Sequence, residues 1–96
     1  MYFKDDAIVF KSRMPLFEKE RCGDKPNTVR VLTDEESDEV IKEYTRTFAN
    51  VSKITIVDAT SKNKEPREFT RKLTDISFTG ALLGYRIAVF SWKHEE

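Results

Sequence analysis

The segment from Ile8 to Leu32 constrains the fold more than any other part of this 96-residue chain. It begins with an apolar run, passes through Pro15 into a short amphipathic stretch, and reaches Gly23 before a second apolar run starts near Asn27. Proline is favoured in the first turn of a helix, and glycine is favoured where a helix ends in a left-handed conformation. The segment therefore predicts a strand, a short helix, a tight corner and a second strand.

The predicted helix is amphipathic. Leu16 and Phe17 are expected to face the core, because they are the large apolar residues of this stretch. The charged residues that follow are expected to stay in water: Glu18, Lys19, Glu20 and Arg21.

Three polar side chains follow the corner, at Lys25, Thr28 and Arg30. Thr28 and Arg30 are two positions apart, so on a strand both side chains point to the same side. Two cations and a hydroxyl can hold a phosphate or the edge of a base. Alternatively, a lysine of lowered pKa can act as a base and make the threonine hydroxyl a nucleophile. The remaining alternative is that both cations are ordinary solvated charges.

The string G-x-K-x-x-T-x-R, filled here by Gly23, Lys25, Thr28 and Arg30, resembles the signature of ASCH domains, which are PUA-like β-barrels. The apolar run from Ala7 to Phe10 is similar to the family's opening strand. The threonine form of the motif resembles the small single-domain bacterial ASCH proteins that hydrolyse N4-acetylcytidine. Those hydrolases also use a glutamate on a helical segment before the closing strand, and residues 74–85 of this chain contain no glutamate.

The resemblance implies a single α+β domain over residues 1–96, a small PUA-like barrel of five or six strands with two short helices. It implies a module that binds RNA or a modified nucleoside in a cleft formed by the motif, with Gly23, Lys25, Thr28 and Arg30 as ligand-binding residues. One alternative is an amidohydrolase acting on N4-acetylcytidine-like acylated nucleosides, with Lys25 and Thr28 catalytic. The other is a small protein-interaction domain without a ligand cleft, which would expose an apolar patch.

The clearest helix begins after Thr33. Thr33 and Glu36 have the spacing of a capping box, in which the hydroxyl and the carboxylate satisfy backbone N–H groups at the helix start. Acidic residues crowd the first turns, where the helix dipole favours them. Apolar residues then recur at helical spacing, so we expect a helix from Asp34 to about Phe48.

The second half of the chain reads as strands. Val51–Thr60 is the first, residues 61–66 form a turn or loop, and Arg67–Phe78 is a returning arm. The apolar residues of this arm change parity, which predicts a bulge near Thr74 and Asp75. Gly80 and Gly84 are expected to bracket a short turn or a single helical turn. Tyr85–Trp92 is apolar at both parities, as expected of a central strand buried on both faces.

The one basic concentration comprises Lys62, Lys64, Arg67, Arg71 and Lys72, which are candidates for nucleic-acid contact. Arg67 and Arg71 share strand parity and are expected on one face. Each phosphate contact would make binding depend on salt. The alternative is a solvated hairpin tip that protects a sheet edge with charge. The whole chain is neutral, with 17 basic and 17 acidic residues, so a nucleic-acid role would rest on a local patch or a base-sized pocket.

Composition excludes several function classes. The single cysteine, Cys22, excludes an internal disulfide and favours a reducing compartment. His94 has no companion ligands, so no metal site and no cofactor are predicted. With neither a signal-peptide pattern nor a long apolar run, the expected location is the cytoplasm.

Overall fold

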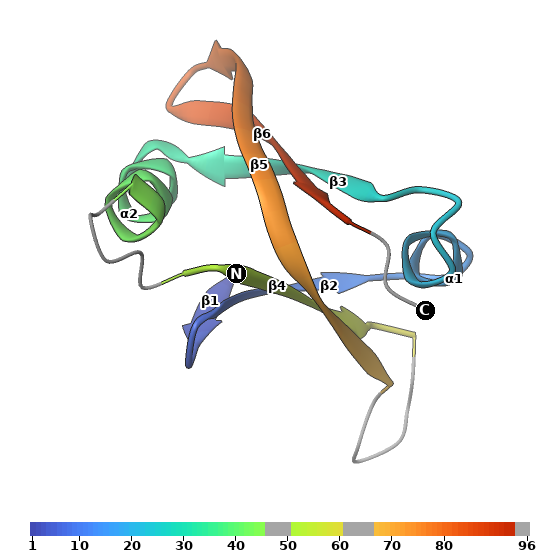
Figure 1. Cartoon of the computed structure of the whole chain (residues 1–96). Coiled ribbons are helices and arrows are strands. Elements are labelled where there is room, and N and C mark those ends of the chain that lie inside the picture. Colours follow the sequence, from blue (N-terminus) through green and yellow to red (C-terminus); the bar gives the residue numbers. More distant parts are fainter. Residues whose placement is uncertain (46–50, 61–66, 94–96) are drawn as a thin grey trace.

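The computed structural model describes residues 1–45, 51–60 and 67–93 (Figure 1). Its elements, in chain order, are β1 (Tyr2–Lys4), β2 (Ala7–Ser12), α1 (Leu16–Arg21), β3 (Asn27–Thr33), α2 (Asp34–Thr45), β4 (Lys53–Asp58), β5 (Glu68–Leu82) and β6 (Tyr85–Trp92). The fold is a small, compact α+β arrangement, as predicted. The predicted strand–helix–corner–strand segment is confirmed, with Gly23 at a φ of 90°.

The strands form one six-stranded mixed sheet in the order β1-β2-β4-β5-β6-β3. β2 and β4 are parallel, and every other neighbouring pair is antiparallel. The parallel pair was not predicted, because the apolar runs indicate strands without indicating their partners.

β5 folds the sheet over on itself. Its first part pairs with β4 and its later part pairs with β6, so one 15-residue strand belongs to both halves of the sheet. The register shifts between Leu73 and Asp75, and again between Phe78 and Gly80. Such bulges bend a strand and increase its twist. The bulge predicted near Thr74 and Asp75 is confirmed, and Figure 1 shows β5 crossing from the layer of β2 and β4 to the layer of β3 and β6.

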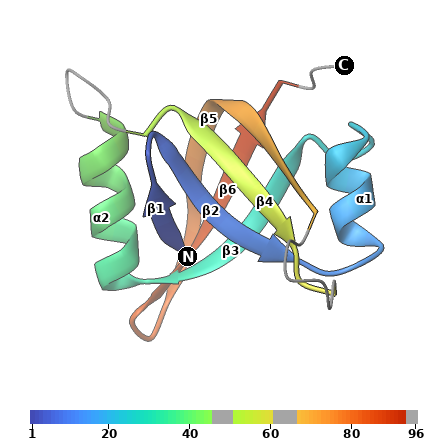
Figure 2. The same cartoon turned by 90° about the horizontal axis from the view of Figure 1, so that it is seen from below.

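The core lies between these two layers. Its largest fully buried side chains include Phe17, Phe90, Ile8, Ile54 and Ile56. Phe10 and Phe90 meet across the layers with ring centroids 4.9 Å apart. The two helices lie at opposite ends of the sheet (Figure 2), so each covers one opening between the layers.

The sheet does not close into a barrel by backbone pairing. β1 and β3 are its two outer strands, and no ladder joins them in the described part of the chain. β1 pairs only with Ala7, Ile8 and Val9 of β2. The remaining residues of β2, from Phe10 to Ser12, therefore have an edge that β1 does not cover.

Two sequence predictions about the last hairpin are wrong. β6 is a central strand, but only one of its faces is buried: Tyr85 is 51% exposed and Ile87 40% exposed. In β6, apolar residues on both faces of the strand therefore do not indicate that both faces are buried. The predicted turn from Gly80 to Gly84 is also shorter than expected, because β5 continues to Leu82. Leu83 and Gly84 alone make the turn, with φ values of 47° and 85°.

The capping box of α2 is confirmed. The Glu36 N–H donates to Thr33 Oγ1 at 3.1 Å, and the Thr33 N–H donates to Glu36 Oε1 at 3.0 Å. α2 runs to Thr45, and the predicted extension to Phe48 lies outside the described residues.

We expect Thr33→Ala to lower the free energy of unfolding by about 1 kcal/mol, because one backbone N–H at the helix start loses its acceptor. Thr33→Ser keeps the hydroxyl and is the matched control, with a loss of less than about 0.5 kcal/mol. Urea titration followed by circular dichroism measures both. Equal effects of the two variants would contradict the capping role.

Candidate functional site

Arg30 lies at the seam between the two outer edges of the sheet. Its Nε donates to Thr28 Oγ1 of the same strand at 3.0 Å. Its Nη1 donates to the Lys11 carbonyl at 2.7 Å, and its Nη2 donates to Ser12 Oγ at 2.6 Å. The last two acceptors belong to the stretch of β2 that β1 leaves uncovered, so one side chain on β3 joins it to β2.

The Arg30 guanidinium also stacks on an aromatic ring. Its central carbon lies 4.9 Å from the centroid of Phe10. Burial lowers the pKa of Arg30, and the carboxylate of Glu20 acts in the opposite direction. A guanidinium has five N–H donors. The three bonds described above use three of them, which leaves donors for a ligand.

A cavity of about 490 Å³ opens beside Arg30, within the size range of small-ligand pockets. Its lining comes from the N-terminal residue, β1, β2, β3 and the first turns of α2: Met1, Tyr2, Phe10, Lys11, Arg30, Val31, Leu32 and Glu36. Tyr2 is 51% exposed, so its ring is free to contact a bound molecule. We call this space the seam cavity.

The structure brings together only part of the predicted motif. Thr28 and Arg30 are bonded to one another, as their strand parity predicts, and Thr28 is only 1% exposed. Gly23 and Lys25 lie in the corner between α1 and β3, where the Lys25 N–H donates to the Lys19 carbonyl at 2.9 Å. No described contact brings the Lys25 ammonium to Thr28 or Arg30. The seam cavity is lined by Arg30 and not by the other three motif residues.

Glu20 corrects the sequence analysis, which placed it in water. It is fully buried, and neither carboxylate oxygen has a hydrogen-bond partner among the described residues. Glu20 is three residues after the buried Phe17, so both side chains are on the same face of α1. This spacing was the signal in the sequence that could have identified it. A buried, unpaired carboxylate is costly, which makes Glu20 a candidate functional residue.

The predicted basic face is largely engaged with α1. Arg67 Nη2 donates to Glu18 Oε1 at 2.7 Å. Arg71 Nη2 donates to the Arg21 carbonyl at 3.2 Å, and its guanidinium stacks 5.0 Å from the Phe69 centroid. The Arg21 and Arg67 guanidiniums lower the pKa of Glu18 to about 2, with Arg21 the larger cause.

The other members of that basic set are placed differently. Lys72 is exposed, and its side chain is on the opposite face of β5 from Phe69. In the sheet it lies opposite Lys53 of β4. Lys62 and Lys64 lie outside the described residues. The described arginines of this set therefore hold α1 against the sheet, and of the described members Lys72 has no bonded partner.

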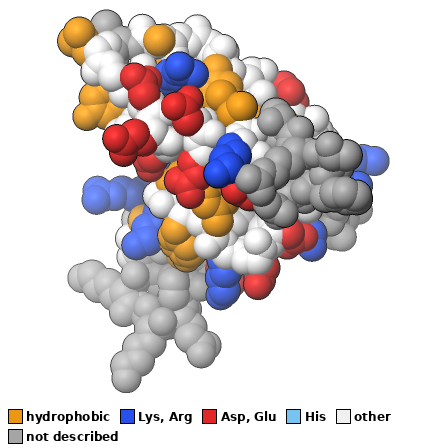
Figure 3. All heavy atoms as spheres, turned by 90° about the vertical axis from the view of Figure 1, so that its left-hand side faces the viewer, with side chains coloured by type: hydrophobic (Ala, Val, Ile, Leu, Met, Phe, Trp, Pro, Cys, Tyr) orange, Lys and Arg blue, Asp and Glu red, His pale blue; other side chains and the backbone are white. Residues whose placement is uncertain are grey.

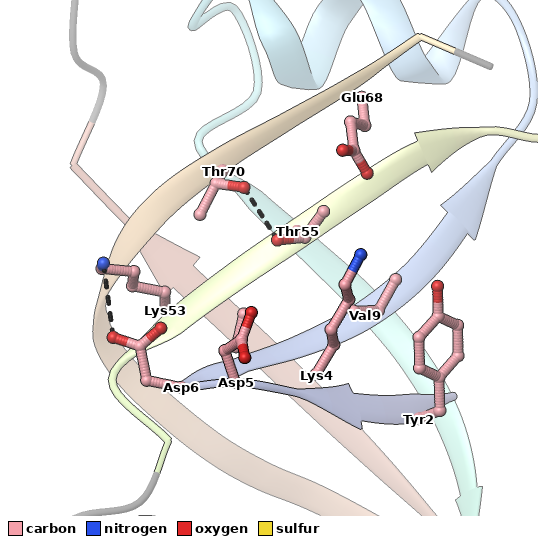
Figure 4. Close-up of a pocket in the computed structure, with 10 residues that line it drawn as sticks. Tyr2, Lys4, Asp5, Asp6, Val9, Lys53, Thr55, Glu68 and Thr70 are labelled. Atoms are coloured by element: carbon pink, nitrogen blue, oxygen red, sulfur yellow. Dashed lines mark hydrogen bonds and ion pairs between the residues drawn. The ribbon is translucent and has the colours of Figure 1, made fainter. Parts of the chain in front are cut away.

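A second hollow, of about 220 Å³, lies over the outer face of β1, β2, β4 and β5 (Figure 4). Its charged groups are mixed in sign. Lys53 pairs with Asp6 at 3.3 Å, and the hydroxyls of Thr55 and Thr70 are 2.8 Å apart. Lys4, Asp5 and Glu68 complete the charged lining. With its cations matched by acids and its central hydroxyls already paired, this hollow is a weaker candidate than the seam cavity.

Within residues 1–45, 51–60 and 67–93, no cluster of histidine, cysteine or acidic side chains has the arrangement of a metal site. No helix in the same residues has the length and apolar character needed to cross a membrane.

Comparison with known proteins gives no further guide. No protein-family model, no curated protein and no solved structure matches the chain.

We expect Glu20→Met to stabilise the protein by about 1–3 kcal/mol, because an apolar side chain of similar length replaces a buried carboxylate that has no hydrogen-bond partner among the described residues. Glu39→Met, at an exposed position of α2, is the control and changes stability by less than about 0.5 kcal/mol. Thermal and urea unfolding measure both. Destabilisation by Glu20→Met would show that the carboxylate has a stabilising partner.

Proposed function

We propose that this protein is an ASCH-type module of PUA-like architecture that binds an unpaired RNA base or a modified nucleoside in the seam cavity. Arg30 carries the proposal, because a partly desolvated guanidinium with unused donors lines a cavity of ligand size. The proposed location is the cytoplasm, in keeping with the free and exposed Cys22.

The lining of the seam cavity suits a base. Proteins read unstacked bases by placing them against an aromatic ring or an arginine plane and by bonding their polar edges. Tyr2 offers an exposed ring, and Arg30 offers N–H donors for a carbonyl oxygen or ring nitrogen. Glu36 offers an acceptor for an exocyclic amino group, since only its Oε1 is used in the capping box.

The proposal includes a PUA-like barrel. A PUA-like barrel requires the two halves of the sheet to act as one closed wall. Support comes from the bulged β5, which belongs to both halves, and from Arg30, which bonds across the seam. A side chain would then complete the wall that the backbone ladders leave open.

Glu20 favours a second candidate, an amidohydrolase acting on N4-acetylcytidine-like nucleosides. The sequence between Thr74 and Tyr85 lacks the glutamate that the family resemblance calls for, whereas Glu20 supplies a buried carboxylate on a helix. The Glu20 carboxylate raises the pKa of Arg30, so it acts on one residue of the motif. In this candidate Lys25 and Thr28 are the catalytic residues, and substrate binding has to bring the Lys25 ammonium to the buried Thr28 hydroxyl, which it does not contact in the structure. Hydrolysis consumes one water and releases acetate and cytidine.

Calorimetric titration with cytidine, N4-acetylcytidine and a short single-stranded RNA tests the proposal at low and moderate salt. We expect Tyr2→Ala to weaken binding about ten-fold, as the loss of one stacked base does. Tyr85→Ala is the matched control: Tyr85 is equally exposed, at 51%, but does not line the cavity. Because Tyr2 also borders the outer hollow, Thr70→Ala is included and should leave the affinity unchanged.

Absence of binding to all three ligands at low salt would contradict the proposal. So would equal weakening by the two tyrosine variants. Release of cytidine from N4-acetylcytidine would instead establish the amidohydrolase. The release should then be lost in Lys25→Ala and Glu20→Met and kept in Lys19→Ala.

A further inference from the structure

The outer face of β3 and β6 carries no charged side chain. Outward positions alternate with inward ones along both strands. The register places the outward residues opposite one another in four rows: Asn27 with Ser91, Val29 with Val89, Val31 with Ile87, and Thr33 with Tyr85. Charged residues make up 35% of the chain, so a run of uncharged positions across two neighbouring strands sets this face apart.

The middle of this face is apolar and open to solvent. Val29 is 53% exposed, Val31 66% and Ile87 40%. Tyr85 and the turn residue Leu83 extend the patch toward the tip of the β5–β6 hairpin. We call these five residues the apolar face. Figure 3 shows several hydrophobic side chains at the upper end of the molecule, where this hairpin lies, with charged side chains between them.

The opposite half of the sheet shows what an ordinary outer face looks like in this protein. The outward positions of its strands carry five charges, at Lys4, Lys11, Lys53, Glu68 and Lys72. The half that contains β3 and β6 has one outward charge on β5, at Asp75 opposite Ser91, and none on β3 and β6 themselves. Exposed apolar patches with polar surroundings mark interaction sites on soluble proteins.

Leu83 adds independent support. It is 90% exposed and has a φ of 47°, a conformation that favours glycine or asparagine. A leucine at this position adds strain and gains little burial within the chain. Contact with another molecule would bury it.

We infer that the apolar face is the contact surface between two copies of this chain. A two-fold axis brings the apolar face of one copy into contact with the apolar face of the other. Valine, isoleucine and tyrosine side chains then pack against apolar side chains, and no charge is buried. A partner with a charged surface would leave those charges desolvated and unpaired. The chain has a net charge of zero, so two copies do not repel one another.

The area is sufficient for a specific contact. Five side chains with these exposures present on the order of 500 Å² of apolar surface, at the upper end of patches on ordinary monomers. Burying this surface on both copies removes roughly 1,000 Å², the lower limit for a specific interface. The expected dimer is therefore one of moderate affinity, with a dissociation constant of roughly 1–10 μM.

This contact can be tested separately from the proposed ligand site. The apolar face shares only Val31 with the lining of the seam cavity. Variants at Val29 and Ile87 therefore test the contact without changing a cavity residue.

Sedimentation equilibrium over about 1–200 μM tests the inference. We expect the full chain to reach twice the 11.2 kDa of one chain. Val29→Lys and Ile87→Lys should sediment as single chains with unchanged circular dichroism. Ile87→Thr keeps the β-branched shape, removes apolar area and should raise the dissociation constant about ten-fold.

Met14→Lys is the matched control, because Met14 is a 37% exposed apolar residue in the connection between β2 and α1, away from the apolar face. It should dimerise like the wild type. A wild-type protein that stays a single chain at 200 μM overturns the inference, as does a dimer that survives Ile87→Lys or is lost in Met14→Lys.

Discussion

The contact on which the rest of this structure depends is the Arg30 guanidinium at the seam of the sheet. It donates to Thr28 on its own strand and to Lys11 and Ser12 on β2, while it stacks on Phe10. Backbone ladders join each strand to its neighbours but leave β3 and β2 unconnected. A planar fork with several donors can span such a gap in a way that a single ammonium cannot. The seam cavity lies beside this contact, so the feature that joins the edges also shapes the candidate site.

β5 makes this arrangement possible. Because its two bulges bend it, one strand can pair with β4 in one half of the sheet and with β6 in the other. The two layers then face one another across a core of aromatic and branched side chains, and Arg30 is brought to the edge of β2. The two outer faces of the folded sheet differ in character: the face of β1, β2 and β4 is charged, and the face of β3 and β6 is apolar. The molecule therefore has two chemically distinct surfaces, the seam beside Arg30 and the outer face of β3 and β6.

Much of this architecture follows from local signals in the sequence. The corner at Gly23, the capping box of Thr33 and Glu36, and the parity change near Thr74 each rest on neighbouring residues, and each is confirmed. The pairing of β2 with β4 depends on contacts between segments that are distant in the chain, and local patterns do not encode it. The spacing of three residues between Phe17 and Glu20 indicates that both lie on the buried face of α1. Glu20 was nevertheless predicted to be exposed, because it is charged. The exposure of Tyr85 and Ile87 was not readable, because apolar residues at both parities describe a doubly buried strand and an apolar surface equally well.

The most direct test of the seam is the free energy of unfolding of Arg30→Lys, compared with Arg13→Lys at an exposed position that makes no described side-chain contact. Lysine keeps the charge but cannot reach Thr28, Ser12 and the Lys11 carbonyl together. If Arg30 joins the two edges, the variant loses about 2 kcal/mol, because buried hydroxyls are left without their charged donor. The Arg13 variant changes by less than about 0.5 kcal/mol. Equal and small effects at both positions would contradict the account.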